Sequence, residues 1–276
     1  MTYPSPTRIR LDIAYDGTNF AGWAVQPNRR TVQGVIEEAL GRILRSKTVV
    51  RLTVAGRTDA GVHALGQVAH TDVTTNMAAA ELQRRLARYL GADSDVAIHA
   101  VTLAPAGFDA RFSAEARRYE YRIMDGAERI NPMERHRAVI LQDRLDMAVM
   151  NDVASRVLGL RDFGAFCKPR FMSTTIRELQ EFSWRRDDDH TLVASLQADA
   201  FCHSMVRALV GACVAVAQGR LSMAGLERLR DGAKRTSKFK VLAPHGLCLT
   251  EVIYPPDALL AERAALTRDR RDLPSE

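Results

Sequence analysis

One stretch of the chain has the residue types and spacing for carboxylate chemistry. In Gly56-Arg57-Thr58-Asp59-Ala60-Gly61-Val62-His63 a single aspartate follows an arginine by two residues and is flanked by glycines. Because glycine lets backbone approach backbone or ligand closely, such a loop can hold one carboxylate in a cleft. A nearby guanidinium favours the ionised form, which suits a nucleophile. A polar turn in which Asp59 caps neighbouring N–H groups is the more frequent outcome for Gly/Asp/Thr turns.

The elements around this stretch are predicted from periodicity. Alternating runs predict strands, and an apolar stripe after the capping residue Thr31 predicts a helix. The first half therefore has the order β-α-β-β-α-β, which is typical of RRM-like or ferredoxin-like domains. In order, the predicted elements are a strand at 9–15, a helix at 32–44, strands at 50–54 and 68–71, a helix at 82–90 and a strand at 96–101.

A Pro/Gly break at 103–107 predicts the boundary between an N-terminal domain, 1–105, and a C-terminal domain, 106–276. The second half again mixes strands and helices, so the fold class is α+β, with mainly antiparallel sheets flanked by helices. Its predicted elements are a strand at 117–123, a helix from Asp143 to Leu158, strands at 174–186 and 191–199 joined by the acidic turn 187–190, a helix opening at 201–211 and a strand at 249–254. We expect the charged tail from Pro255 onward to be frayed.

The stretch around Asp59 resembles the signature of the TruA-type tRNA pseudouridine synthases, in which the aspartate is catalytic. Four further stretches resemble the same family, in the family's order. They are Tyr15-Asp16-Gly17 with Phe20-x-Gly22-Trp23, then Arg117-Arg118-Tyr119 with the segment before it, then Phe201-x-x-x-Met205-Val206-Arg207, and finally Ala243-Pro244-His245-Gly246-Leu247. Ala24 and Val25 stand where the family usually has polar or basic residues before Gln26.

The resemblance implies a pseudouridine synthase fold, with two RRM-like halves and an active-site cleft between them. It implies isomerisation of uridine to pseudouridine at positions 38, 39 and 40 of the tRNA anticodon arm, by a homodimer and without a cofactor or metal. The implied catalytic residues are Asp59, Arg57, Tyr119 and Arg207, and the implied substrate-binding residues are Tyr119, Arg57, Thr58, Gln67 and Gln26. Residue chemistry alone leaves Tyr119 open as a core residue, Arg207 as a surface ion pair, and His63 as a structural residue or a proton relay.

Composition is compatible with this function without requiring it. The 276 residues carry 39 Lys+Arg against 33 Asp+Glu, a net charge of +6 that fits a polyanionic partner. No stretch approaches the length of a membrane span, so we expect a cytoplasmic protein. The four cysteines, Cys167, Cys202, Cys213 and Cys248, form no C-x-x-C pair, and we expect buried free thiols.

Three alternatives stay open. The same chemistry could act on other RNA sites, or the chain could be a non-catalytic tRNA-binding or folding protein. The third is a hydrolase that uses an aspartate nucleophile on a small substrate, and the absence of a second carboxylate or general base from the signature argues against it.

Overall fold

The chain has an α+β fold, as predicted, with mostly antiparallel strands flanked by helices. The computed structural model describes residues 6–126, 130–168 and 174–268. Within these residues the chain forms two compact units, one of 6–115 with 249–268 and one of 116–248.

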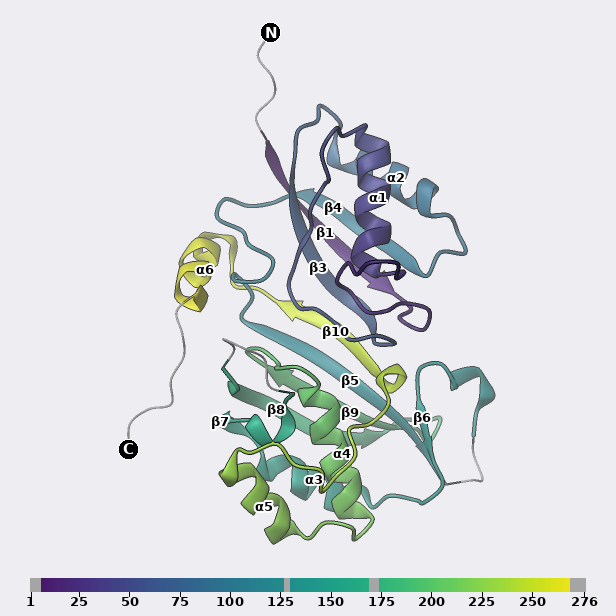
Figure 1. Cartoon of the computed structure of the whole chain (residues 1–276), viewed down its shortest axis with the longest axis vertical. Helices are drawn as coiled ribbons and strands as arrows, with labels where there is room; N and C mark the ends of the chain where they lie inside the picture. The colour runs from purple at the N-terminus through teal and green to yellow at the C-terminus, as the bar shows by residue number, and fades with distance from the viewer. Residues whose placement is uncertain (1–5, 127–129, 169–173, 269–276) are drawn as a thin grey trace. The chain divides into compact units, whose positions relative to one another are not determined.

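The first unit has the predicted β-α-β-β-α-β order. Its strands run in the order β4-β1-β3, β2 pairs with β3, and these pairs are antiparallel. Figure 1 shows α1 and α2 alongside these strands. The elements are β1 (Thr7–Tyr15), α1 (Val32–Leu44), β2 (Thr53–Val54), β3 (His63–Val73), α2 (Ala79–Leu90) and β4 (Val96–Leu103), followed after the second unit by β10 (Leu247–Ile253) and α6 (Leu260–Arg268).

Local chemistry accounts for the helix that precedes the Asp59 loop. The Thr31 hydroxyl caps α1 by accepting a hydrogen bond from the Gly34 N–H at 3.3 Å. The buried Glu37 carboxylate on α1 accepts from the Leu52 N–H at 2.8 Å and from the Arg51 guanidinium at 3.1 Å. These bonds tie the helix to the segment that enters the loop.

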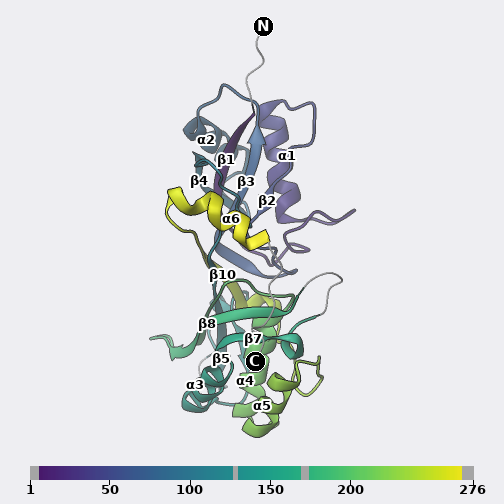
Figure 2. The ribbon, with the colours of Figure 1, turned by 90° about the vertical axis from the view of Figure 1, so that its left-hand side faces the viewer.

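The second unit, like the first, is built of mostly antiparallel strands and of helices. Strands β5, β9 and β8 are antiparallel neighbours, β7 pairs with β8, and β6 runs parallel to β5. The helices α3, α4 and α5 lie close together beside these strands (Figure 2). The elements are β5 (Ala116–Asp125), β6 (Val139–Leu141), α3 (Met147–Arg156), β7 (Gly159–Asp162), β8 (Ile176–Arg186), β9 (Leu192–Ala198), α4 (Met205–Ala217) and α5 (Met223–Gly232).

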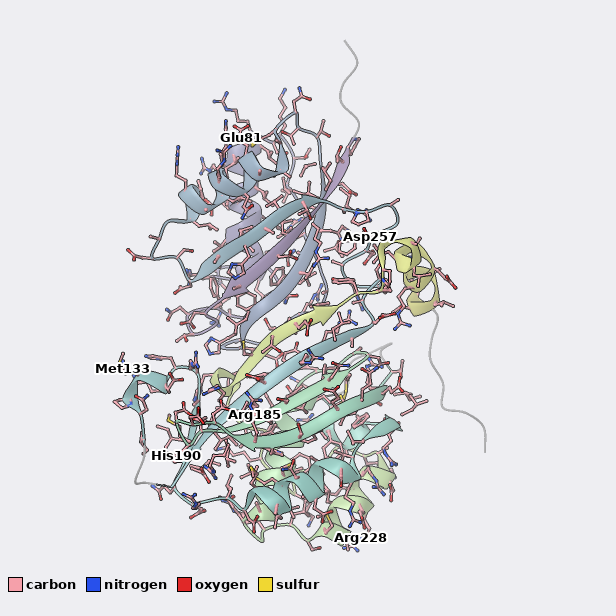
Figure 3. The ribbon with its side chains drawn as sticks, turned by 180° about the vertical axis from the view of Figure 1, so that it is seen from behind. Glu81, Met133, Arg185, His190, Arg228 and Asp257 are labelled. Carbon is pink, nitrogen blue, oxygen red and sulfur yellow. A yellow bond between two sulfur atoms is a disulfide. The ribbon has the colours of Figure 1, made fainter. Side chains whose placement is uncertain are left out.

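The acidic turn of the β8–β9 hairpin is ion-paired. Arg185 and His190, both labelled in Figure 3, mark this end of the hairpin. The Arg122 guanidinium lies 3.2 Å from the Asp187 carboxylate and 3.3 Å from that of Asp189, and Arg185 pairs with Asp187 at 2.9 Å. The carboxylates of Asp187 and Asp189 in the acidic turn are thus ion-paired.

Several element boundaries differ from the predictions. The helix predicted to begin at Asp143 begins at Met147, because the Asp146 carboxylate accepts the N–H groups of Ala148 and Val149. The strand predicted at 50–54 is only Thr53–Val54. From Pro255 the chain is not frayed throughout, since α6 buries Leu260 and Ala264; the tail residues 269–276 lie outside the described residues.

The expectation of four free thiols was wrong. Cys167 and Cys202 are joined as a disulfide, with their Cα atoms 5.8 Å apart. The two segments lie alongside each other, because the Lys168 N–H donates to the His203 carbonyl at 3.0 Å. Cys213 and Cys248 keep their thiols, and complete burial raises the pKa of Cys213 to about 12.

None of the helices in the described part of the chain is both long enough and apolar enough to cross a membrane.

Candidate active site

The loop that carries Asp59 connects β2 to β3 in the first unit. The Asp59 side chain is half-buried, Thr58 is buried, and Arg57 is exposed. At its start the loop is closed by the Ala55 N–H, which donates to the Val68 carbonyl at 2.9 Å. The Asp59 carboxylate is only partly withdrawn from solvent, so it can reach a bound molecule, and the exposed Arg57 guanidinium can bind a phosphate.

Two side chains, those of Tyr15 and Gln67, hold the first part of this loop. The Tyr15 hydroxyl lies 2.8 Å from the Thr58 hydroxyl, and the Gln67 amide donates to the Tyr15 hydroxyl at 3.3 Å. The same Gln67 amide donates to the Gly56 carbonyl at 2.8 Å. Because Gln67 has no exposed surface, its place in the structure supports a role in shaping the loop.

A second segment, residues 20–23, lies directly against the loop backbone. A Cβ on Gly22 would come within 2.9 Å of the Thr58 carbonyl oxygen and 3.1 Å of the Ala60 nitrogen, and its φ of +95° also favours glycine. The Trp23 N–H donates to the Thr58 carbonyl at 3.1 Å, and the Gly61 N–H donates to the Phe20 carbonyl at 3.3 Å. Trp23 is 1% exposed, so it is the core residue that its aromatic type predicts.

Gln26 lies on the surface of the first unit. Its side-chain amide donates to the Ala21 carbonyl at 2.8 Å. The neighbouring Val25 is exposed, and its N–H donates to the Gln33 side chain at 3.3 Å. Gln26 is therefore accessible to a large ligand. The exposed Val25 beside it is apolar, although the resemblance predicts a polar or basic residue at this position.

In the second unit, Tyr119 and Tyr121 point to different partners from the same strand, β5. Tyr119 is 7% exposed, and its ring meets that of Phe201 edge-on, with centroids 5.1 Å apart. The buried Tyr121 hydroxyl donates to the Ala243 carbonyl at 2.7 Å, and burial raises the pKa of this phenol well above its ordinary value. Tyr121 is thus a packing residue.

Arg207 lies in the first turn of α4 and is part-buried. Its Nε–H donates to the Leu242 carbonyl at 2.7 Å, and the Leu242 N–H donates back to the Arg207 carbonyl at 3.2 Å. These bonds fix the base of the guanidinium fork against the segment that leads into the Ala243-Pro244 motif. A fork held in this way is pre-organised to receive a carboxylate or phosphate.

Sequence reasoning did not single out Phe201 or Ser204 as site residues. Phe201 is the ring partner of Tyr119, and Ser204 precedes α4 in a left-handed conformation, with φ 65°. A non-glycine residue in this region is costly and often occurs at functional sites. The signal available was the position of both residues inside the Phe-x-x-x-Met-Val-Arg motif.

The described residues hold no cluster of three or more His, Cys, Asp or Glu side chains that could bind a metal.

Comparison with known proteins decides the family. The family model described as tRNA pseudouridine synthase matches residues 13–113 and 153–255. The chain belongs to the tRNA pseudouridine synthase family. The first matched range includes Asp59, and the second includes Arg207.

Bacterial relatives of this family match the chain along nearly its whole length. Proteins named tRNA pseudouridine synthase A are similar to it in Leifsonia xyli (53% identity, 97% of this chain and 98% of the relative), Cutibacterium acnes (51%, 96% and 95%) and Mycobacterium leprae (46%, 96% and 95%). The resemblance stated from the motifs is confirmed, and the chain is an isomerase of this family.

Proposed function

We propose that this protein isomerises uridine to pseudouridine at positions 38, 39 and 40 in the anticodon arm of tRNA, with Asp59 as the catalytic carboxylate. The observation that carries the proposal is the Asp59 loop itself. Its aspartate is half-buried, and its neighbours on both sides are held by Tyr15, Gln67 and the 20–23 segment. Catalysis requires a reacting group to be held in a fixed position before the substrate arrives.

The reaction breaks the bond between N1 of uracil and C1′ of ribose, and forms a bond from C5 to the same C1′. The hydrogen on C5 leaves as a proton and N1 gains one, so the product is an isomer of the substrate. In one pathway the Asp59 carboxylate attacks C1′ and is later displaced; in the other it removes the C2′ proton. Both need an ionised carboxylate beside the sugar.

The other site residues receive the roles that their chemistry suits. Arg57, which is exposed, would bind backbone phosphate beside the reacting uridine. Tyr119 would stack on the detached uracil, with Phe201 supporting its ring. The Arg207 fork would orient a carboxylate or a phosphate.

Substrate binding would also use Thr58, Gln67 and Gln26. Of these, Gln26 is exposed and can reach RNA directly, whereas Thr58 and Gln67 would act on the loop backbone. A uridine in a stem must be flipped out of the helix, at a cost of a few kcal/mol, before it reaches these residues. Phosphate contacts from arginine would supply that free energy and make binding salt-dependent.

We further propose that the protein works in the cytoplasm as a homodimer, in keeping with the tRNA substrate. Sedimentation equilibrium on the purified protein tests the dimer, since a single species of monomer mass would contradict it.

Position-resolved mapping tests the proposed specificity. An unmodified tRNA transcript is incubated with the protein, treated with a carbodiimide that marks pseudouridine, and read by reverse transcription. We expect stops at uridines 38, 39 and 40 only, and none when cytidine replaces them. Stops outside the anticodon arm would place the same chemistry at other RNA sites. Tight tRNA binding without stops would favour a non-catalytic RNA-binding protein.

A further inference from the structure

His63 is the first residue of β3 and follows Asp59 by four positions. The residue is 9% exposed, and its ring faces the turn at the end of β1. The buried Gly17 N–H donates to the Nδ1 of His63 at 3.0 Å. An N–H donor needs a lone pair on the nitrogen that accepts it, so in this hydrogen bond Nδ1 of His63 is the acceptor.

The turn that His63 holds is in direct contact with the Asp59 loop. A Cβ on Gly17 would come within 2.0 Å of the Val62 carbonyl oxygen, so the two backbones touch. The Val62 N–H donates in turn to the Asp59 carbonyl at 3.2 Å. A displacement of Gly17 would therefore pass through one peptide to the backbone of the aspartate.

The Asp16 carboxylate lies beside the same ring nitrogen and is also bonded to Thr18. Asp16 Oδ1 lies 3.1 Å from the same Nδ1, and it also accepts the Thr18 N–H at 2.9 Å and the Thr18 hydroxyl at 2.6 Å. These two bonds hold the Asp16 carboxylate beside the imidazole. Nδ1 is thus the atom through which His63 holds the Gly17 N–H.

We propose that His63 is a positioning residue, whose Nδ1 lone pair anchors Gly17 and thereby holds Asp59 in its reactive place, and that it transfers no proton. The inference rests on the proposed catalytic role of Asp59. It requires a hydrogen-bond acceptor at the Nδ1 position and does not require a titratable ring.

Two substitutions of His63 distinguish the role of hydrogen-bond acceptor from that of proton carrier. In His63→Asn the amide oxygen is bonded to Cγ, as Nδ1 is, so it can accept from Gly17 but cannot relay a proton. In His63→Leu the bulk is similar and the acceptor is gone. We expect His63→Leu to lower kcat by about 10- to 100-fold with KM for tRNA within about 3-fold, since small displacements of a catalytic group have effects of this size. His63→Asn should keep kcat within about 3-fold of wild type, with a pH profile of unchanged shape.

The result that overturns the proposal is a His63→Asn variant as slow as His63→Leu, which would assign the ring a proton-transfer role. Wild-type activity in His63→Leu would equally overturn it, since the anchor would then be dispensable. If the leucine variant does not fold, the kcat and pH profile of His63→Asn decide alone.

Amide hydrogen exchange gives a readout that is independent of activity. The Gly17 and Val62 amides should exchange at least 10-fold faster in His63→Leu than in wild type and should stay protected in His63→Asn. Unchanged exchange in His63→Leu would refute the anchor even if the wild-type protein modified no tRNA. Failure of the proposed function, read as no turnover by wild type, is thereby distinguished from failure of this inference.

Discussion

Removing the Tyr15 hydroxyl tests whether its hydrogen bonds hold the Asp59 loop in place. In Tyr15→Phe the Thr58 hydroxyl loses a partner at 2.8 Å, whereas the Gln67 amide loses only a long bond of 3.3 Å and keeps the Gly56 carbonyl. A buried hydrogen bond contributes about 1 kcal/mol, and a buried hydroxyl left without its partner costs more. We expect the free energy of unfolding to fall by about 1.5 kcal/mol, roughly tenfold in the unfolding equilibrium.

A double-mutant cycle in urea isolates the bond. Thr58→Val removes the partner, and the double variant should cost about 1 kcal/mol less than the sum of the single variants, because no polar group is then left unpaired. Tyr89→Phe is the matched control, since Tyr89 is 48% exposed and the loss of its hydroxyl should change neither stability nor activity. In turnover assays Tyr15→Phe should lower kcat more than it raises KM. A coupling free energy below about 0.3 kcal/mol would refute the reasoning.

Three further outcomes follow from the structure. Arg207→Ala should lower both turnover and tRNA affinity, read by single-turnover kinetics and filter binding, whereas the exposed Arg228→Ala should change neither; an unchanged Arg207→Ala rate would mean a purely structural arginine. Asp125→Asn should cost about 3 kcal/mol in urea unfolding, because Arg186 binds this carboxylate through two bonds of 2.6 and 3.0 Å; a loss under about 1 kcal/mol would contradict a strong pair. Burial, with Arg8 nearby, lowers the pKa of His70 in the folded protein. The unfolded chain therefore takes up the proton first, and the free energy of unfolding should fall as pH drops below about 6.5. His70→Asn should lose this pH dependence of stability and keep the bond from the Ala110 N–H.

The fold was predictable where local patterns decide structure. The helix Val32–Leu44 begins where Thr31 predicts, and the β8–β9 hairpin turns at the predicted acidic residues. Boundaries failed where two side chains compete for one role, as at Asp143 and Asp146. The sequence carries no signal that tells which unit residues 249–268 join, because that depends on contacts far along the chain.

The candidate site likewise has a part that the sequence predicts and a part that it does not. The aspartate loop stands out in the sequence through its unusual residue types. The bonds that hold it join residues that are distant in sequence, such as Tyr15 to Thr58 and Gly17 to His63, 43 and 46 positions apart. No periodicity records such contacts. The Cys167–Cys202 disulfide was missed for the same reason, since its partners are 35 residues apart and follow no spacing motif.

Tritium release from tRNA carrying [5-³H]uridine tests the central claim most directly, because joining C5 to C1′ expels the hydrogen on C5. Wild type and Asp59→Asn are compared at equal tRNA occupancy, with binding measured in parallel. We predict release by wild type, and release by Asp59→Asn below about one part in a thousand of that rate, with tRNA affinity within a few-fold. Release by Asp59→Asn at a rate near that of wild type would contradict the role of Asp59, and no release by tRNA-bound wild type would contradict the reaction itself.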